Sequence, residues 1–302
     1  MAALRPLLLW ITTLAAALPG WGAALERIPS ARLKREVPVA LHVPRPEVMA
    51  RWRAAHPEEP MQLVLFLPGA WDGPEDFLSQ GLEAFLTEQE AKGALPPSLW
   101  VAVTHFQSWY ADRQDGSFPY ERFLMEELLP LLETRYPGFG GAPPARSVAG
   151  LSMGGFGALN LSARTGAFSR CLALSPAFVE APFSSYQWFI RRSLRRTFPL
   201  EPARFAPWNP WMHLGGTAEV VIGSGLEDRY NLGAACRDFA GRCAEQGRPI
   251  RVDLRPGGHD WAFWTPVFKD WMPWLVRQPD AEGPVASILP MPPVTKGSRL
   301  VR

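Results

Sequence analysis

Short runs rich in Val, Ile and Leu recur along the chain, and stretches with helical periodicity separate most of them. These runs show little alternation with polar residues, which is typical of strands covered on both faces. Strands alternating with helices predict an α/β fold, in which helices cover both faces of a mostly parallel sheet. The predicted strands are 37–43, 62–67, 99–105, 146–150, 170–175, 219–223 and 250–255, and the predicted helices are 75–92, 120–136, 154–165 and 231–247.

The N-terminus has the layout of a secretory signal peptide. Arg5 precedes an apolar run from Leu7 to Leu18, and small residues follow at 22–24, where cleavage is expected. The run is well short of the roughly 20 apolar residues that span a membrane, so stable membrane insertion is not expected. We predict that residues 1–24 are a signal peptide and that the protein is secreted or periplasmic.

One domain over residues 25–277 is the simplest partition of the chain. Two segments depart from the alternation of strands and helices. Residues 182–215 are rich in Trp, Phe, Pro and Arg, and we expect them to form a lid-like insertion over the cleft. Residues 278–302 turn to Pro, Gly and small residues, and we expect them to be disordered.

Charge and cysteine usage narrow the classes of function. The formal net charge is +2 without a long basic run, so the charge pattern gives no support for nucleic-acid binding. The three cysteines lack the CxxC spacing of metal sites. Cys236 and Cys243 would lie about 10 Å apart along one helix, too far for a disulfide. We expect these two thiols and Cys171 to be free and buried.

The stretch SVAGLSMGGFGAL crowds four glycines around Ser152. Within it, GLSMG fits G-x-S-x-G, the sharp strand-to-helix turn that lifts a serine nucleophile out of a sheet. The pattern alone is weakly specific, but a predicted strand leads into it and a predicted helix follows. This context makes Ser152 the candidate nucleophile.

A serine hydroxyl needs a base, and the base needs an orienting carboxylate. His259 lies in RPGGHDW, just beyond the predicted strand 250–255, where open α/β sheets place their sites. It is therefore the candidate base. The other four histidines are expected to be structural: His42, His56, His105 and His213.

The acid is expected in the loop SGLEDRYN after the predicted strand 219–223. That loop offers Glu227 and Asp228, of which we favour Asp228, while Asp253 and Asp260 are weaker candidates. The order serine, aspartate, histidine along the chain is that of the α/β-hydrolases.

Backbone amides are needed to stabilise the oxyanion that forms during attack on an ester. The residue after the nucleophile, Met153, supplies one amide. The loop PGAWDG after the predicted strand 62–67 supplies the second, because Gly69 permits close approach and Ala70 or Trp71 presents an N–H group.

Five segments together resemble one branch of the α/β-hydrolases, the "putative esterase" branch: LVLFLPGAWDG, FLMEELLPLLETRYP, VAGLSMGGFGAL, GSGLED and RPGGHDWAFW. The opening IPSARLKREVPVALHVPRP resembles the leading strand pair of that branch. The "putative esterase" branch contains esterase D, feruloyl and acetylxylan esterases, enterochelin esterases and mycolyltransferases. The resemblance implies an α/β-hydrolase fold and no metal or organic cofactor. It places the nucleophile on Ser152, the base on His259, the acid on Asp228, and the oxyanion amides on Met153 and Ala70.

Two departures from the branch are visible. Many members carry His-Gly in the first loop, where this chain has Pro68-Gly69, so the local hydrogen bonding must differ. The insertion 182–215 makes it unsafe to transfer the substrate of any one member.

These observations predict a secreted serine carboxylesterase that hydrolyses a carbohydrate acyl ester or a short acyl ester through an acyl-enzyme. One alternative is an acyltransferase that passes the acyl group to a sugar. Another is a non-catalytic carbohydrate-binding or interaction protein on an esterase scaffold, although the complete set of Ser152, Asp228 and His259 speaks against it.

Aromatic and basic side chains offer candidate substrate contacts. Trp71, Trp109 and Trp188 are the candidates to line the cleft, with core packing as the competing interpretation. The insertion also carries a helix-spaced basic patch, which is either a solvated face or a dock for an acidic substrate. Its members are Arg191, Arg192, Arg195 and Arg196.

Overall fold

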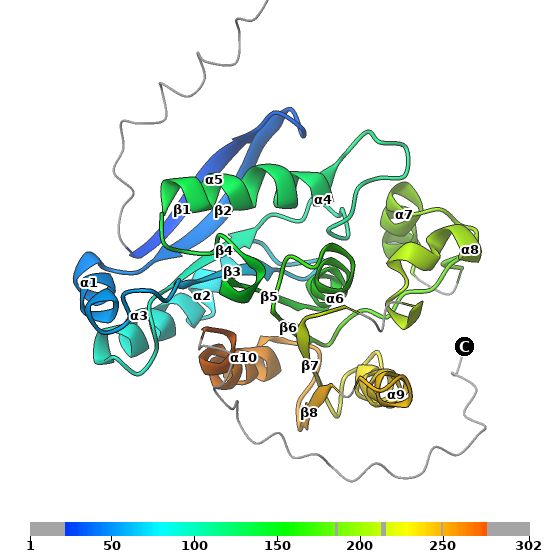
Figure 1. The fold of residues 1–302 in the computed structure, drawn as a ribbon. Helices are drawn as coiled ribbons and strands as arrows, with labels where there is room; N and C mark the ends of the chain where they lie inside the picture. The colour runs from blue at the N-terminus through cyan, green and yellow to red at the C-terminus, as the bar shows by residue number, and fades with distance from the viewer. Residues whose placement is uncertain (1–21, 185–186, 213–215, 249, 277–302) are drawn as a thin grey trace, which may run out of the picture.

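The computed structural model describes residues 22–184, 187–212, 216–248 and 250–276. An eight-stranded sheet forms the centre of this part, with the order β1-β2-β4-β3-β5-β6-β7-β8 (Figure 1). β1 and β2 form an antiparallel hairpin at one edge, β2 is antiparallel to β4, and the remaining pairs are parallel. The strands are β1 (Gly22–Ser30), β2 (Arg35–Val43), β3 (Gln62–Leu67), β4 (Ser98–Val103), β5 (Arg146–Leu151), β6 (Arg170–Leu174), β7 (Glu219–Gly225) and β8 (Arg251–Arg255).

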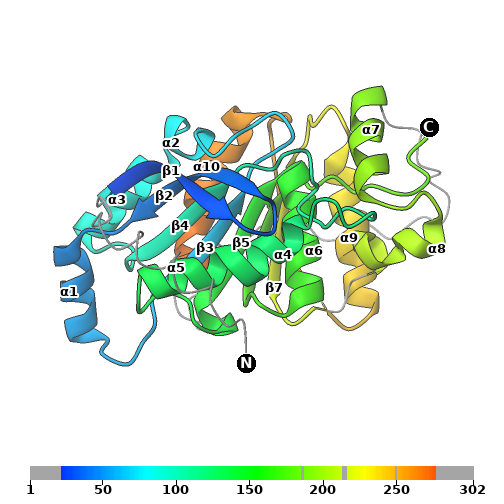
Figure 2. The same ribbon diagram turned by 90° about the horizontal axis from the view of Figure 1, so that it is seen from above.

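Helices cover both faces of the sheet, as the two views in Figures 1 and 2 show. The prediction of a mostly parallel sheet with helices on both faces is therefore confirmed. The helices are α1 (Pro46–Ala55), α2 (Asp76–Ser79), α3 (Leu82–Lys92), α4 (Tyr120–Phe123), α5 (Leu129–Arg135), α6 (Met153–Thr165), α7 (Trp188–Thr197), α8 (Pro202–Phe205), α9 (Leu232–Glu245) and α10 (Trp261–Val276).

Strand β3 shows why the run from Leu63 to Leu67 is apolar without interruption. All six of its residues are buried. Leu63, Leu65 and Leu67 join the core layer that includes α6 and α9, whereas Val64 and Phe66 join the layer that includes α3 and α10. A strand with helices on both faces has no solvent side, so no polar residue alternates with the apolar ones.

Five elements were missing from the predicted strands and helices: β1, α1, α7, α8 and α10. β1 is an edge strand in which buried and exposed positions alternate, so it lacks the continuous apolar signal, although the family resemblance indicated a leading strand pair. α10 contains Pro266 and Pro273, which lower helix propensity. Burial of its aromatic face, which includes Trp271 and Phe268, outweighs that cost. The predicted helix 75–92 is divided in two at Gly81, which adopts a left-handed φ of 71°.

The insertion 182–215 contains α7 and α8, which lie near α6 on the side of the molecule away from α1 (Figures 1 and 2). α7 buries Ser193, Leu194 and Thr197. Phe198, directly after this helix, packs its ring against Phe156 of α6 at 5.8 Å between centroids. The insertion is therefore fixed to the core through an aromatic contact.

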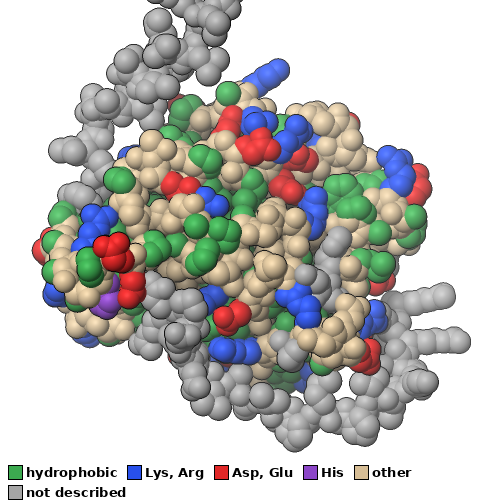
Figure 3. Space-filling model, viewed as in Figure 1, with side chains coloured by type: hydrophobic (Ala, Val, Ile, Leu, Met, Phe, Trp, Pro, Cys, Tyr) green, Lys and Arg blue, Asp and Glu red, His purple; other side chains and the backbone are tan. Residues whose placement is uncertain are grey.

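The thiols of Cys171, Cys236 and Cys243 are free and buried, as predicted. No helix within the described ranges is both long and apolar enough to cross a membrane. The apolar run of the predicted signal peptide and the predicted disordered tail lie outside the described residues. Residues 22–24, the expected cleavage region, belong to β1. On the face drawn in Figure 3, basic and acidic side chains are interspersed.

Candidate active site

Ser152 occupies the sharp turn between β5 and α6. Its backbone adopts φ 53° and ψ −114°, a region that non-glycine residues rarely enter. Its amide donates to the Leu174 carbonyl at 2.9 Å, and its own carbonyl accepts from the Phe156 and Ala177 amides at 3.1 and 3.0 Å. These bonds hold the strained conformation in place. The turn leaves the Ser152 hydroxyl at the carboxyl end of the parallel strands.

The glycines around Ser152 exclude a side chain for different reasons. A Cβ at Gly150 would overlap the Gly154 carbonyl, and one at Gly154 would overlap the Leu67 carbonyl, so the turn itself excludes side chains. A Cβ at Gly155 would come within 2.9 Å of the Cα of Pro176, just past β6.

Gly157 makes room for a loop rather than for the sheet. A Cβ at this position would lie 2.5 Å from the ring of Tyr110, which follows β4. Gly155 therefore lets α6 approach the end of β6, whereas Gly157 accommodates an aromatic ring.

His259 bridges Ser152 and Asp228. Its Nε2 lies 3.0 Å from Ser152 Oγ, and its Nδ1 lies 2.7 Å from Asp228 Oδ2. Tyr230 and Trp264 contact the ring edge-to-face at centroid distances of 4.8 and 5.0 Å. The imidazole is held by packing as well as by hydrogen bonds, with 8% of its side chain exposed.

Asp228 is the carboxylate that reaches the imidazole, and its side chain is fully buried. Burial alone would raise its pKa, but hydrogen bonds from His259 and from the Tyr230 amide, the latter at 2.9 Å, favour the charged form. The net effect is a lowered pKa, so the group is an anion at neutral pH. It can accept the Nδ1 proton of His259 and fix the tautomer that leaves Nε2 free to accept a proton.

The competing acids are occupied elsewhere. Glu227 accepts a hydrogen bond from the Gly257 amide, and its own amide donates to the Gly257 carbonyl at 3.0 Å. Asp253 binds Arg255 and the indole of Trp271, and Asp260 accepts from the Phe263 amide in the first turn of α10. Glu227 therefore joins the loop that carries Asp228 to the loop that carries His259.

The loop after β3 lies directly against Ser152. A Cβ placed on Gly69 would be 3.5 Å from Ser152 Cβ and 2.8 Å from Leu151 Cδ1, so only glycine permits this approach. Met153 is the first residue of α6, where backbone amides are free of intrahelical partners. The amides of Ala70 and Met153 therefore belong to the two segments that flank the Ser152 hydroxyl.

Two side chains that sequence reasoning missed hold this loop. The Tyr110 hydroxyl donates to the Pro68 carbonyl at 2.6 Å, and Gln107 Nε2 donates to the Ala70 carbonyl at 2.8 Å. These bonds fix the peptide units around Gly69, where this chain departs from His-Gly. No motif marks either residue in the sequence. The space left at Gly157 for the Tyr110 ring is visible only in three dimensions.

The segment that carries Gln107 and Tyr110 is itself unusual. Four of its non-glycine residues have left-handed φ values between 47° and 58°: Phe106, Gln107, Trp109 and Tyr110. Burial lowers the pKa of His105 to about 4, so its ring is neutral, and Nδ1 accepts from the Gln107 amide at 2.9 Å. Such backbone strain is concentrated at functional sites.

A further contact joins two loops of the site. One is the loop 68–73, called the oxyanion loop because the amide of Ala70 is expected to bind the oxyanion, and the other is the loop that carries His259. The indole of Trp261, at the start of α10, donates to Asp72 Oδ1 at 2.9 Å. Because Asp72 follows Ala70 by two residues and Trp261 follows His259 by two, this bond joins the two loops across the site.

The three candidate tryptophans differ in exposure. Trp109 is 2% exposed, its indole donates to Ser193 Oγ at 2.9 Å, and its ring packs edge-to-face on Phe156. The proposed substrate contact of Trp109 is therefore corrected to a packing role that attaches α7 to the core. Trp71 and Trp188 are 72% and 68% exposed, and Phe189 lies between them with ring contacts to both.

Two further histidines, His42 and His56, have hydrogen-bond partners other than Ser152. His42 is buried between Glu83 and Glu90, at 3.0 Å from each carboxylate. His56 stacks on Trp52, and His213 lies outside the described residues. Within the described ranges, no group of three or more His, Cys, Asp or Glu side chains is placed to hold a metal ion.

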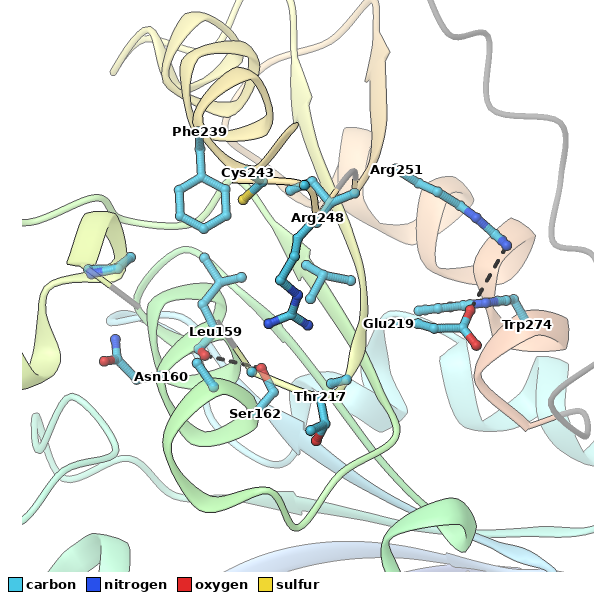
Figure 4. A pocket seen from close by; sticks show the side chains of 17 residues that line it. Leu159, Asn160, Ser162, Thr217, Glu219, Phe239, Cys243, Arg248, Arg251 and Trp274 are labelled. Atoms are coloured by element: carbon cyan, nitrogen blue, oxygen red, sulfur yellow. Dashed lines mark hydrogen bonds and ion pairs between the residues drawn. The ribbon is translucent and has the colours of Figure 1, made fainter. Parts of the chain in front are cut away.

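A cavity of about 420 Å³ is lined by residues other than Ser152, His259 and Asp228 (Figure 4). Leu159 and Ser162 of α6, Glu219 at the start of β7, and Cys243 of α9 line it. Since Glu219 begins its strand and Asp228 follows the end of that strand, the cavity is at the opposite edge of the sheet from Ser152.

Comparisons with known proteins identify the family and the fold. The family model described as "Putative esterase" matches residues 30–275. S-formylglutathione hydrolase from Staphylococcus aureus is similar in structure, with a TM-score of 0.68 and 18% identity over 85% of this chain and 99% of that one. The S-formylglutathione hydrolase from Agrobacterium tumefaciens has a TM-score of 0.63 and 20% identity over 85% of this chain and 95% of that one. MPT51 from Mycobacterium tuberculosis has a TM-score of 0.62 and 19% identity over 85% of this chain and 100% of that one. No curated protein sequence matches this chain.

Proposed function

The chain belongs to the "Putative esterase" family of carboxylic ester hydrolases, and from this premise we propose that it is a secreted serine esterase whose catalytic triad is Ser152, His259 and Asp228. The observation that carries the proposal is the chain of contacts at 3.0 and 2.7 Å from the Ser152 hydroxyl through the imidazole to Asp228. We further propose one catalytic domain over residues 25–277, with 182–215 as its lid-like insertion.

Acylation begins when Ser152 Oγ attacks the ester carbonyl and His259 Nε2 takes the hydroxyl proton. The imidazolium that forms is stabilised by the buried anion of Asp228. The carbonyl oxygen becomes an oxyanion and accepts hydrogen bonds from the amides of Met153 and Ala70. Loss of one such donor typically raises the barrier by about 3 kcal/mol.

Collapse of the tetrahedral intermediate breaks the bond to the alcohol, which leaves with the proton from His259 Nε2. Water then enters, gives a proton to the same nitrogen, and attacks the acyl group on Ser152. The second intermediate collapses to release the acid and restore the serine hydroxyl. Every proton in the cycle passes through one nitrogen, so the tautomer that Asp228 imposes is needed in both halves of the reaction.

The surroundings of Ser152 support a carbohydrate acyl ester or a short acyl ester as substrate. Trp71 and Trp188 present large apolar surfaces to solvent next to the oxyanion loop, where a sugar ring or an acyl chain can lie. The structural relatives named S-formylglutathione hydrolase act on a thioester of glutathione, a cytosolic thiol. The predicted export of this chain favours an ester found outside the cytoplasm.

Labelling with a fluorophosphonate probe tests the nucleophile. The wild type is expected to be labelled, Ser152→Ala is expected to lose both labelling and hydrolysis of p-nitrophenyl acetate, and Ser79→Ala serves as the exposed-serine control. Hydrolysis that persists in Ser152→Ala would contradict the triad. A panel of p-nitrophenyl esters of increasing chain length, together with acetylxylan and methyl ferulate, then identifies the acyl group. Adding a sugar acceptor separates hydrolysis from acyl transfer.

A further inference from the structure

Four arginines gather where the end of α7 packs against the loop 112–118. Arg195 and Arg196 come from α7, Arg113 comes from the loop, and Arg35 comes from the start of β2. A hollow of about 410 Å³ lies among Arg113, Arg195 and Arg196, with Gln114 and Asp115 completing its lining.

The cluster has too few anions for its cations. Within the described part of the chain, none of these four arginines forms an ion pair with a carboxylate. The Nε of Arg113 is buried without a hydrogen-bond partner. Asp115 is the acidic residue of the hollow, and its carboxylate accepts from the Ser117 amide at 2.9 Å. Burial, and to a smaller extent the nearby Arg196, lower the pKa of Arg113.

Two of the four guanidinium groups pack on aromatic rings. The Arg113 guanidinium lies 4.7 Å from the centre of the Phe118 ring, and Arg35 lies 4.8 Å from the centre of Phe106. The Gln114 amide donates to the Thr197 carbonyl at 2.9 Å, and its side chain donates to the Arg195 carbonyl at 3.1 Å. The loop and the end of α7 therefore form one unit, on which the exposed side chains of Arg195 and Arg196 line the same hollow as Arg113.

Helix α7 also connects this cluster to the triad. Phe189 in its first turn contacts Trp71 at 5.1 Å between ring centroids, and Trp71 follows the proposed oxyanion residue Ala70. Arg196 is seven residues further along, or about 10 Å along the helix axis. An extended molecule that lies along α7 can thus present an ester to Ser152 and an anionic group to the arginines.

We propose that the hollow lined by Arg113, Arg195 and Arg196 is a subsite for an anionic group of the substrate, so that the esterase acts on acyl esters of acidic carbohydrates. Guanidinium groups bind carboxylate, sulfate and phosphate oxygens through paired hydrogen bonds. A hollow admits a projecting acidic group of a sugar chain, whereas a flat membrane surface does not enter it. This inference rests on the proposed function, since it concerns the substrate of the same triad.

Binding to Ser152→Ala tests the subsite without turnover. Trigalacturonate is expected to bind to this variant and xylotriose to bind much more weakly. Adding Arg196→Gln to the Ser152→Ala variant is expected to weaken trigalacturonate binding about tenfold, which is the loss typical of one charge-assisted hydrogen bond. The matched control is Arg242→Gln in the same Ser152→Ala background, since it removes the same charge from the exposed face of α9. This control is expected to leave trigalacturonate binding unchanged. Inorganic sulfate and inorganic phosphate, titrated as competitors, show which anionic oxygens the hollow accepts.

Kinetics with the active enzyme provide a second measurement. Arg196→Gln is expected to lower kcat/KM for acetylated polygalacturonate about tenfold while leaving acetylxylan and p-nitrophenyl acetate unaffected. Equal affinity for the acidic and neutral trisaccharides, or equal effects of Arg196→Gln and Arg242→Gln, would overturn the subsite. Binding to phosphatidylglycerol vesicles in place of trigalacturonate would overturn it in favour of a membrane contact. If Ser152→Ala retained hydrolysis, the proposed triad would fail while the binding measurements still decided the subsite.

Discussion

The hydroxyl of Tyr110 donates a hydrogen bond to the carbonyl of Pro68 at 2.6 Å and thereby fixes the start of the oxyanion loop. Both groups are buried, and the tyrosine ring occupies the space left by Gly157. The bond joins the segment after β4 to the segment after β3. The catalytic geometry proposed for Ala70 therefore depends on a tyrosine from a different loop.

Tyr110→Phe is expected to lower kcat about tenfold with a small change in KM, because the Ala70 amide loses its fixed direction toward the oxyanion. The unpaired Pro68 carbonyl is also expected to cost about 1–3 kcal/mol of unfolding free energy. Steady-state kinetics and urea denaturation measure the two effects. Tyr136→Phe is the control, since the buried Tyr136 hydroxyl has no hydrogen-bond partner. Equal kcat values for the two variants would exclude a positioning role for Tyr110.

Asp228→Asn is expected to lower kcat about 10⁴-fold, because an amide at this position favours the wrong tautomer of His259. Glu227→Gln keeps a carbonyl oxygen that can still accept from Gly257 and is expected to lower kcat less than about tenfold. Comparing kcat for the two variants identifies the triad acid. A larger loss in Glu227→Gln would reverse the assignment.

Stability is expected to fall as the pH rises from neutral to alkaline values, because His42 loses its proton. Burial opposes its charge, but Glu83 and Glu90 outweigh burial and raise its pKa to about 9. A pKa raised above the ordinary histidine value of 6.5 adds stability that is complete below pH 6.5 and disappears as the pH rises through about 9.

The size of this effect follows from the shift in pKa and is about 3 kcal/mol. Urea denaturation of the wild type and of His42→Gln at about pH 6 and about pH 9.5 measures it. The difference between the two proteins is expected to shrink at the higher pH. His56→Gln is the control, because the His56 ring contacts a carbonyl and an indole rather than carboxylates. A difference that stayed constant with pH would show that His42 carries no charge in the folded protein.

Trp71 and Trp109 are expected to respond oppositely to substitution. Trp71→Ala removes an exposed ring beside the oxyanion loop, so KM for a carbohydrate ester is expected to rise several-fold with little change in Tm. Trp109→Phe breaks the bond to Ser193 and leaves a gap in the core, so Tm is expected to fall. Thermal unfolding and the KM of both variants test the contrast. A rise in KM for Trp109→Phe at unchanged Tm would restore Trp109 as a substrate contact.

Much of the fold and the candidate triad could be predicted from the sequence because both leave local signals. The buried strands are continuous apolar runs, and Ser152 and His259 each lie in a glycine-rich turn just beyond a predicted strand. The choice of Asp228 over Glu227 could only be a preference, since adjacent residues in a loop point in directions that depend on φ and ψ. Gln107 and Tyr110 could not be found, because their partners are distant carbonyls and carbonyls carry no sequence signature. Trp109 was misplaced because an indole suits a core and a cleft equally well.

The insertion that holds α7 enters between β6 and β7, two strands paired directly in the sheet. Its two ends are therefore held by neighbouring strands whatever its length or content. Ser152 and His259 come from strand ends outside this segment, and Asp228 follows the strand that closes it. The proposed lid can consequently be exchanged as a module while the proposed triad residues keep their places. This gives engineering of the scaffold a defined segment through which to change what the protein recognises.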